Sequence, residues 1–209
     1  MSDEKEWMKW IRELRALSQT GLHFCDNEYD RERYEAVGRV AAEMLARCSG
    51  LNVGEALELQ AREMGYATPK VDVRGVVFRE KRILLVSEKA DGGRWTLPGG
   101  WADVNETPSQ AVEREIREES GFVTRAEKLL AVYDRDRQGH VPAFPYTVYK
   151  HFFLCRIVSG EAKGNHETEA VDFFDRTALP ELSPSRVSRS QLLRFFDHLE
   201  HPEWSTDFD

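Results

Sequence analysis

Three glutamates in the middle of the chain have the spacing of a helical carboxylate cluster. Glu115, Glu118 and Glu119 stand at i, i+3 and i+4, so a helix would project all three from one face. Carboxylates this close repel one another unless cations lie between them. Oxygen ligands suit magnesium or manganese, and magnesium commonly shares its coordination shell with phosphate oxygens. The alternative for the three side chains alone is a solvated acidic helix face.

A glycine pair and an arginine frame this cluster. Gly99 and Gly100 precede the expected helix, where the backbone must turn sharply or approach a ligand closely. Arg114 lies within the helix, and we expect its guanidinium to pair with Glu106 in the preceding loop. That pair would fix the loop against the helix, which is an architectural role.

The helix itself is expected over residues 108–120. Pro108 suits the first turn of a helix, and Gly121 suits its end. β-rich runs surround it, and a last amphipathic helix follows them. The predicted strands cover residues 71–78, 82–87, 129–133, 146–157 and 170–174, and the last helix covers 186–199. We assign all of these elements to one domain, residues 71–209.

The first 65 residues read as helical. Apolar residues recur at three- and four-residue spacing, which predicts three helices. The three apolar stripes cover residues 7–17, 37–45 and 53–64. We expect the first helix to end at Gly21, and residues 66–70 to form a linker. A helical domain of residues 1–65 is near the lower size limit for independent stability, so it should pack on the rest of the chain or on a second copy.

Composition narrows the class of partner. The net charge is −8 over 209 residues, which disfavours general binding to nucleic acid or to anionic membranes. A phosphorylated ligand can still bind if metal ions supply local positive charge. No apolar stretch is long enough to span a bilayer, and the charged first residues lack the apolar core of a signal peptide. Three scattered cysteines form no metal-ligand spacing or even disulfide set, so a cytoplasmic location is expected.

Nine positions between residues 100 and 122 fit a single known pattern. They are Gly100, Glu106, Arg114, Glu115, Ile116, Glu118, Glu119, Gly121 and Phe122. The segment resembles the Nudix box of the Nudix hydrolase superfamily without a departure, and residues 95–100 resemble its usual lead-in. The resemblance implies an α/β/α sandwich around a mixed sheet, here preceded by a small all-α domain. It also implies hydrolysis of a diphosphate linkage with Mg²⁺, for which Mn²⁺ could substitute.

The same resemblance implies roles for the residues of the cluster. Glu115, Glu118 and Glu119 would bind the cations, and a backbone carbonyl at Gly99 or Gly100 would complete a metal shell. Segments outside the box resemble one Nudix subgroup with a helical N-terminal domain. These segments are residues 17–22, 30–34, 68–75 and 133–140. That subgroup hydrolyses nucleoside diphosphates linked to a group X, as CDP-choline pyrophosphatase-like and ADP-ribose pyrophosphatase-like enzymes do, releasing a nucleoside monophosphate and phospho-X.

The general base that takes the proton from water stays open. Two candidates, Glu118 and Glu119, lie within the box, and two lie in the loop before residue 170, where some family members place a base or ligand. The loop candidates are Glu167 and Glu169, with His166 and His140 as further possibilities. Each of these four could instead be a solvated loop residue.

Candidate substrate contacts come from the loops around the box. Arg94 could pair with a phosphate. Trp101 could stack on a base or shield the loop of the box, or it could pack in the core. Arg135 could line a phosphate channel, or belong to a charged turn with Asp134 and Asp136.

Two other functions compete with hydrolysis. A nucleotide-sensing regulator without catalysis could lose its metal ligands, whereas all three carboxylates are present here. A DNA-binding role for the three helices conflicts with their charge, because residues 1–65 hold 9 basic and 13 acidic side chains. We expect this domain to form a homodimer instead, since Trp7 and Trp10 offer large apolar area.

Overall fold

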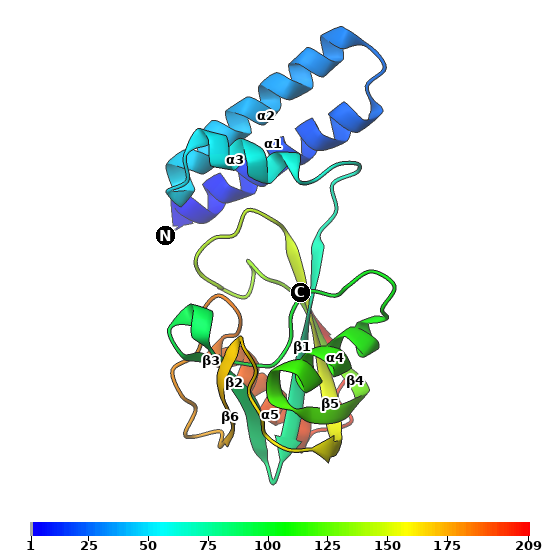
Figure 1. Ribbon diagram of the computed structural model, residues 1–209, viewed down its shortest axis with the longest axis vertical. Helices are drawn as coiled ribbons and strands as arrows, with labels where there is room; N and C mark the ends of the chain where they lie inside the picture. Colours follow the sequence, from blue (N-terminus) through cyan, green and yellow to red (C-terminus); the bar gives the residue numbers. More distant parts are fainter. Residues whose placement is uncertain (1) are drawn as a thin grey trace. The chain divides into compact units, whose positions relative to one another are not determined.

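The computed structural model describes residues 2–209, with side chains described from Glu6 onward, and Figure 1 labels the helices and strands. The chain forms two compact units. The first contains the residues up to Pro69 together with Ala143–Thr147, and the second contains Lys70–Pro142 and Val148–Asp209. No helix within residues 2–209 is both long enough and apolar enough to cross a membrane.

The first unit consists of three helices, α1 (Ser2–Phe24), α2 (Glu28–Ser49) and α3 (Val53–Ala61). The prediction that α1 ends at Gly21 is wrong, because the helix continues through it. A Cβ at Gly21 would lie 2.3 Å from the ring of Tyr34, so this glycine allows α1 and α2 to approach closely instead of ending a helix. Buried apolar side chains between the helices form the core of the unit. They are Met8, Ile11, Ala42, Leu45 and Ala56.

A short segment from later in the chain, Ala143–Thr147, belongs to this helical unit. Arg12 donates to the carbonyl oxygens of Phe144 (3.2 Å) and Tyr146 (3.3 Å), and Arg15 donates to that of Pro145 (3.0 Å). The Arg15 guanidinium also lies 4.6 Å from the centre of the Tyr146 ring. Two arginines of α1 therefore hold the segment by its backbone.

The second unit is built on a mixed sheet. Its strands are β1 (Lys70–Arg79), β2 (Arg82–Glu88), β3 (Arg94–Thr96), β4 (Phe122–Asp134), β5 (Val148–Gly160), β6 (Thr168–Phe174) and β7 (Asp207–Phe208). Their order is β3-β2-β1-β5-β4-β7, with β6 beside β2. β1 and β5 are parallel, as are β4 and β7, while the other pairs are antiparallel. A 3-10 turn, η1 (Lys89–Asp91), links β2 to β3.

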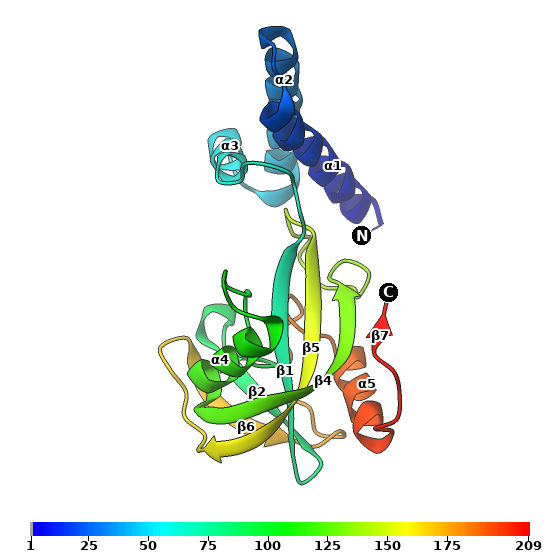
Figure 2. The same ribbon diagram turned by 90° about the vertical axis from the view of Figure 1, so that its right-hand side faces the viewer.

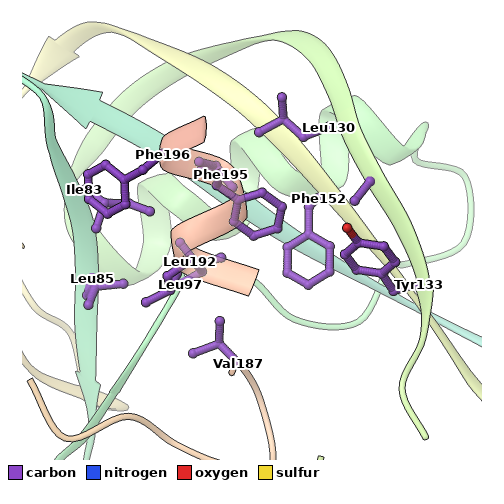
Figure 3. Packing of buried hydrophobic residues seen from close by; sticks show 12 residues of the cluster. Ile83, Leu85, Leu97, Leu130, Tyr133, Phe152, Val187, Leu192, Phe195 and Phe196 are labelled. Carbon is purple, nitrogen blue, oxygen red and sulfur yellow. The ribbon is translucent and has the colours of Figure 1, made fainter. Parts of the chain in front are cut away.

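Two helices cover opposite faces of this sheet, α4 (Pro108–Ser120) and α5 (Arg189–Glu200), as Figure 2 shows. α4 packs closely on β1, where a Cβ at Gly75 would lie 2.4 Å from Ile116. α5 contributes Leu192, Phe195 and Phe196 to a second cluster with Phe152 of β5 (Figure 3). The predicted α/β/α sandwich with a preceding all-α part is confirmed.

β4 begins at Phe122, seven residues before the predicted strand at 129. Its first half alternates buried and less buried positions, and the exposed ones hold Val123, Arg125 and Glu127. Because the apolar residues there are scattered, the sequence shows no continuous apolar run, and only the pairing with β5 fixes the strand.

Candidate active site

Helix α4 positions the three glutamates through well-defined ends. Thr107 accepts a hydrogen bond from the backbone of Gln110, whose side chain accepts one from the backbone of Thr107, so the pair forms a capping box. Pro108 occupies the first turn, and Gly121 ends the helix with a φ of 78°. The apolar side of α4 faces the sheet, which leaves the glutamates at the edge nearest the Gly99-Gly100 loop.

Arg114 pairs with Glu106 and also reaches the glutamate cluster. Its Nε donates to Glu106 Oε1 (2.9 Å) and its Nη2 to Glu106 Oε2 (3.0 Å). Its Nη1 donates to Glu115 Oε1 (2.8 Å) and to Glu118 Oε2 (3.2 Å). The hydrogen bonds from Arg114 lower the pKa of Glu106. Arg114 thus joins the loop to the helix and neutralises part of the acidic face.

Glu119 is the buried member of the cluster, with 5% of its surface exposed. Its Oε2 accepts a hydrogen bond from the backbone N–H of Gly99 (2.8 Å). Burial raises its pKa to about 8, against the opposing positive charge of Arg74. The negative charges of Glu88 and Glu115 add to the increase. The positive charge of Arg74 therefore does not fully compensate for the burial of the Glu119 carboxylate.

The glycine loop meets the carboxylates through its backbone. Gly99 has a φ of 144°, and a Cβ there would lie 2.0 Å from the carbonyl oxygen of Val73. A Cβ at Gly100 would lie 2.9 Å from Glu115 Oε1. Burial raises the pKa of Glu115, while Arg114 acts to lower it. A side chain at position 99 would meet the backbone of Val73, whereas one at position 100 would have to displace the Glu115 carboxylate.

The donor set fits a hard divalent cation, although within residues 2–209 no three acidic, histidine or cysteine side chains already converge on one point. Arg114 draws Glu115 and Glu118 towards itself, whereas Glu119 turns to Gly99. Within the described chain, Oε1 of Glu119 makes no hydrogen bond. A buried carboxylate with a raised pKa and an unused oxygen is the observation that fits magnesium or manganese.

Two charged residues near Glu119 were not predicted from the sequence. Glu88, the last residue of β2, is buried, and Arg186 Nε lies 3.5 Å from its Oε1. Arg74 of β1 is buried as well, and its charge acts on both Glu119 and Glu88. The available signal was a charged residue within or ending an apolar strand, which is unusual unless it is paired.

The loop candidates for a general base lie beside the end of α4. Glu167 and Glu169 are exposed and flank Thr168, whose Oγ1 donates to the backbone carbonyl of Glu119 (2.9 Å). The structure therefore brings this loop to α4 through Thr168. His166 is exposed and lies 3.3 Å from Glu167 Oε1.

His140 is buried and not an exposed loop residue. Its Nδ1 lies 3.2 Å from the carbonyl oxygen of Pro184, and its Nε2 lies 3.3 Å from Gln191 Nε2. Burial lowers its pKa to about 4. The neutral ring lies between Pro184, in the segment before α5, and Gln191 in the first turn of α5.

The candidate substrate residues have different surroundings. Arg94 is partly exposed and bonds Asp91 and Glu181, each at 3.1 Å. Arg135 is buried, and its Nη2 donates to the carbonyl oxygen of Pro142 (2.8 Å). Trp101 follows the glycine loop directly and is 49% exposed. Of the three, Trp101 offers the largest open surface beside the glutamates.

Two family models match consecutive parts of the chain. Residues 68–196 match the model of the NUDIX domain. This chain belongs to the Nudix family. Residues 5–59 match a second model, described as a UDP-X-like, N-terminal oligomerisation domain.

Relatives of this Nudix hydrolase include proteins that match over nearly the full length. The Bacillus subtilis protein YjhB, provisionally named as an ADP-ribose pyrophosphatase, is 44% identical over 99% of this chain and 98% of its own. An ADP-ribose pyrophosphatase of Methanocaldococcus jannaschii is 36% identical over 56% of this chain and 69% of its own. The crystal structure of a UDP-X diphosphatase is 31% identical, covers 99% of both chains and has a TM-score of 0.62. That of an ADP-ribose pyrophosphatase from Streptococcus suis is 37% identical over 68% of this chain and 100% of its own, also with a TM-score of 0.62. The chain is an enzyme of the Nudix pyrophosphatase type.

Proposed function

We propose that this enzyme hydrolyses the diphosphate linkage of a nucleoside diphosphate linked to a group X, with UDP-X-like and ADP-ribose-like compounds as the first substrates to examine. The products would be a nucleoside monophosphate and phospho-X. The observation that carries the proposal is the placement of Glu115 and Glu119 beside the Gly99-Gly100 backbone, with Glu118 joined to Glu115 through Arg114. Full-length similarity to a UDP-X diphosphatase supports the substrate class.

The reaction is attack of water on one phosphorus, with cleavage of the bond to the bridging oxygen. A cation held by the three glutamates, Mg²⁺ by preference and Mn²⁺ as a substitute, would acidify the water and neutralise phosphate charge. The residues that would hold it are Glu115, Glu118, Glu119 and a backbone carbonyl at Gly99 or Gly100. Arg114 would release two of these carboxylates to the cation while keeping Glu106.

The proton from water needs a carboxylate that solvent can reach. Glu118 is half exposed on the glutamate face of α4, and Glu167 and Glu169 are exposed beside Thr168. Glu119 is buried and bonded to Gly99, which favours a ligand role over proton transfer. The pH–rate profiles of Glu118→Gln, Glu167→Gln and Glu169→Gln identify the base, because only its loss removes the acidic limb.

Substrate contacts are proposed at Trp101 and Arg94. The exposed indole of Trp101 could stack on a nucleobase, and Arg94 could exchange its partner Glu181 for a phosphate. Arg135, the third candidate, is engaged with Pro142, so we assign it to holding its own loop.

Assembly as a homodimer through the helical unit is also proposed. α1 carries a stripe of large apolar side chains that are exposed in the single chain. The stripe consists of Trp7, Trp10, Leu17 and Phe24. The family description of this region as an oligomerisation domain supports the same role. Its burial against a second copy would remove a large apolar surface from water.

The test is a panel of nucleoside diphosphate derivatives incubated with Mg²⁺, with products identified by mass. The expected result is a nucleoside monophosphate plus phospho-X, complete loss with EDTA, and a loss of more than about 100-fold in Glu119→Gln. Binding of nucleotides without any turnover would instead favour a regulator without catalysis.

A further inference from the structure

A cluster of three buried charged side chains lies next to the glutamate site. Asp72 and Arg74 stand two residues apart on β1, and Lys150 is the register partner of Asp72 on β5. All three side chains are buried, with 5%, 5% and 2% of their surfaces exposed. Asp72 and Lys150 are 78 residues apart in the sequence, and no local motif connects them.

Asp72 holds two cations at once. Lys150 Nζ donates to its Oδ1 (2.7 Å), Arg74 Nε donates to the same oxygen (2.9 Å), and Arg74 Nη2 donates to Oδ2 (2.7 Å). Although burial acts to raise it, the two cations keep the pKa of Asp72 well below its usual range. Asp72 therefore fixes the guanidinium of Arg74 in one orientation.

The other side of Arg74 faces the glycine loop. Its Nη1 donates to the carbonyl oxygen of Leu97 (3.2 Å), two residues before Gly99. The backbone on either side of Arg74 bonds to the same loop, from Val73 N to Gly100 O and from Gly75 N to Pro98 O, each 2.8 Å. Arg74 is thus bound to the loop through its side chain and flanked by two backbone hydrogen bonds to it.

We propose that Arg74, anchored by Asp72 and Lys150, is a positioning residue that sets the Leu97–Gly100 loop so that its backbone and Glu119 can bind the divalent cation together. This inference rests on the metal site of the proposed function. Gly99 connects the loop to Glu119, because its N–H donates a hydrogen bond to the Glu119 carboxylate. Its backbone has a φ of 144° and packs against Val73. Burying Asp72, Arg74 and Lys150 together is costly, and apolar residues could fill the same space, so a positioning task accounts for the cluster.

The charge of Arg74 and its proposed positioning role predict opposite effects of its removal on cation binding. Arg74 is a cation near metal ligands, so its removal should tighten cation binding if charge alone mattered. If Arg74 positions the loop, its removal should weaken cation binding in spite of the lost charge. Loss of residues that orient metal ligands commonly costs about 10–100-fold in metal affinity.

The experiment measures Mn²⁺ binding to the full chain, with free Mn²⁺ counted by electron paramagnetic resonance, without substrate. Arg74→Met should bind Mn²⁺ at least about tenfold more weakly than the wild-type chain. Arg74→Lys keeps the charge but has one nitrogen, which cannot reach both Asp72 oxygens and Leu97 together, so it should weaken binding by a smaller factor. Arg156→Met is the matched control, because Arg156 is an exposed arginine of β5 paired with Glu127.

Melting curves and circular dichroism establish that each variant is folded. If Arg74→Met does not fold, Arg74→Lys and Lys150→Met decide, and both should bind Mn²⁺ more weakly. Unchanged or tighter Mn²⁺ binding in the folded Arg74 variants would overturn the inference while leaving the metal site intact. A wild-type chain that binds no Mn²⁺ would overturn the metal site of the proposed function, and this inference with it.

Discussion

Replacing Glu119 with glutamine should stabilise the metal-free protein, and only at high pH. The carboxylate is 5% exposed, and burial raises its pKa from the ordinary 4.5 to about 8. The native state therefore binds more protons than the unfolded state between pH 4.5 and 8, so stability falls as pH rises through that window. Glutamine is neutral at every pH and can still accept the hydrogen bond from Gly99.

The size of the effect follows from the same shift. The difference between 4.5 and about 8 corresponds to about 5 kcal/mol of stability if the ionised carboxylate gains no new solvation. Water entering the site on ionisation offsets part of this cost, so we expect a gain of roughly 2–4 kcal/mol in Glu119→Gln at pH 9. That gain corresponds to a rise of about 4–16 °C in the melting temperature. Near pH 4.5 the two proteins should have nearly the same stability.

The assay is urea unfolding in EDTA at several pH values between 4.5 and 9, with Glu118→Gln as the control. Glu118 lies one residue away, but its side chain is 47% exposed, so water screens its charge and the difference should be much smaller. A stability difference between Glu119→Gln and the wild-type chain that does not change with pH would refute the reasoning. It would mean that the buried carboxylate finds a cation or water in the metal-free protein.

Arg114→Ala should lower the free energy of unfolding by about 1–3 kcal/mol, because Glu106, Glu115 and Glu118 lose a partner that they share and whose side chain is only 20% exposed. An unchanged urea midpoint together with lost activity would instead make Arg114 a substrate ligand. Burial lowers the pKa of His140 from 6.5 to about 4, so between these pH values the unfolded state binds more protons than the native state, and stability is lost as the pH falls. His140→Gln should reduce this loss of stability between pH 7 and pH 4 by roughly 2–3 kcal/mol, measured by urea unfolding at both pH values. Trp7→Ser with Trp10→Ser should convert a dimer to monomers in light scattering, and an unchanged mass would exclude this stripe as the interface.

The sequence was most informative where function depends on local spacing. The i, i+3 and i+4 glutamates, the Arg114–Glu106 pair and the ends of α4 all lie within about 20 residues, so helix geometry and capping rules apply directly. The shared face of the three glutamates therefore follows from residue spacing alone.

Contacts set by distant pairing were not predictable in this way. Lys150 meets Asp72 only because β1 and β5 are parallel neighbours in one specific register, which no local pattern encodes. The sequence indicates Arg135 as a phosphate-channel or charged-turn residue and His140 as a candidate base or an exposed loop residue, whereas contacts with Pro142 and Pro184 bury both. Gly21 is of a residue type that commonly ends helices, but here it lies inside α1 and allows the helix to pack closely against Tyr34.

The helical unit is not contiguous in the gene. Its last five residues, Ala143–Thr147, are encoded far downstream of the rest, and Arg12 and Arg15 hold them by their carbonyl oxygens. Deleting the first 69 codons would therefore remove most of the module but leave its final piece behind without Arg12 and Arg15. A transplant of this unit onto another Nudix enzyme must carry the matching loop segment as well, and must join the host at three points along the chain instead of one. A protease that cuts only the linker before Lys70 would leave two fragments still held together by those arginine contacts.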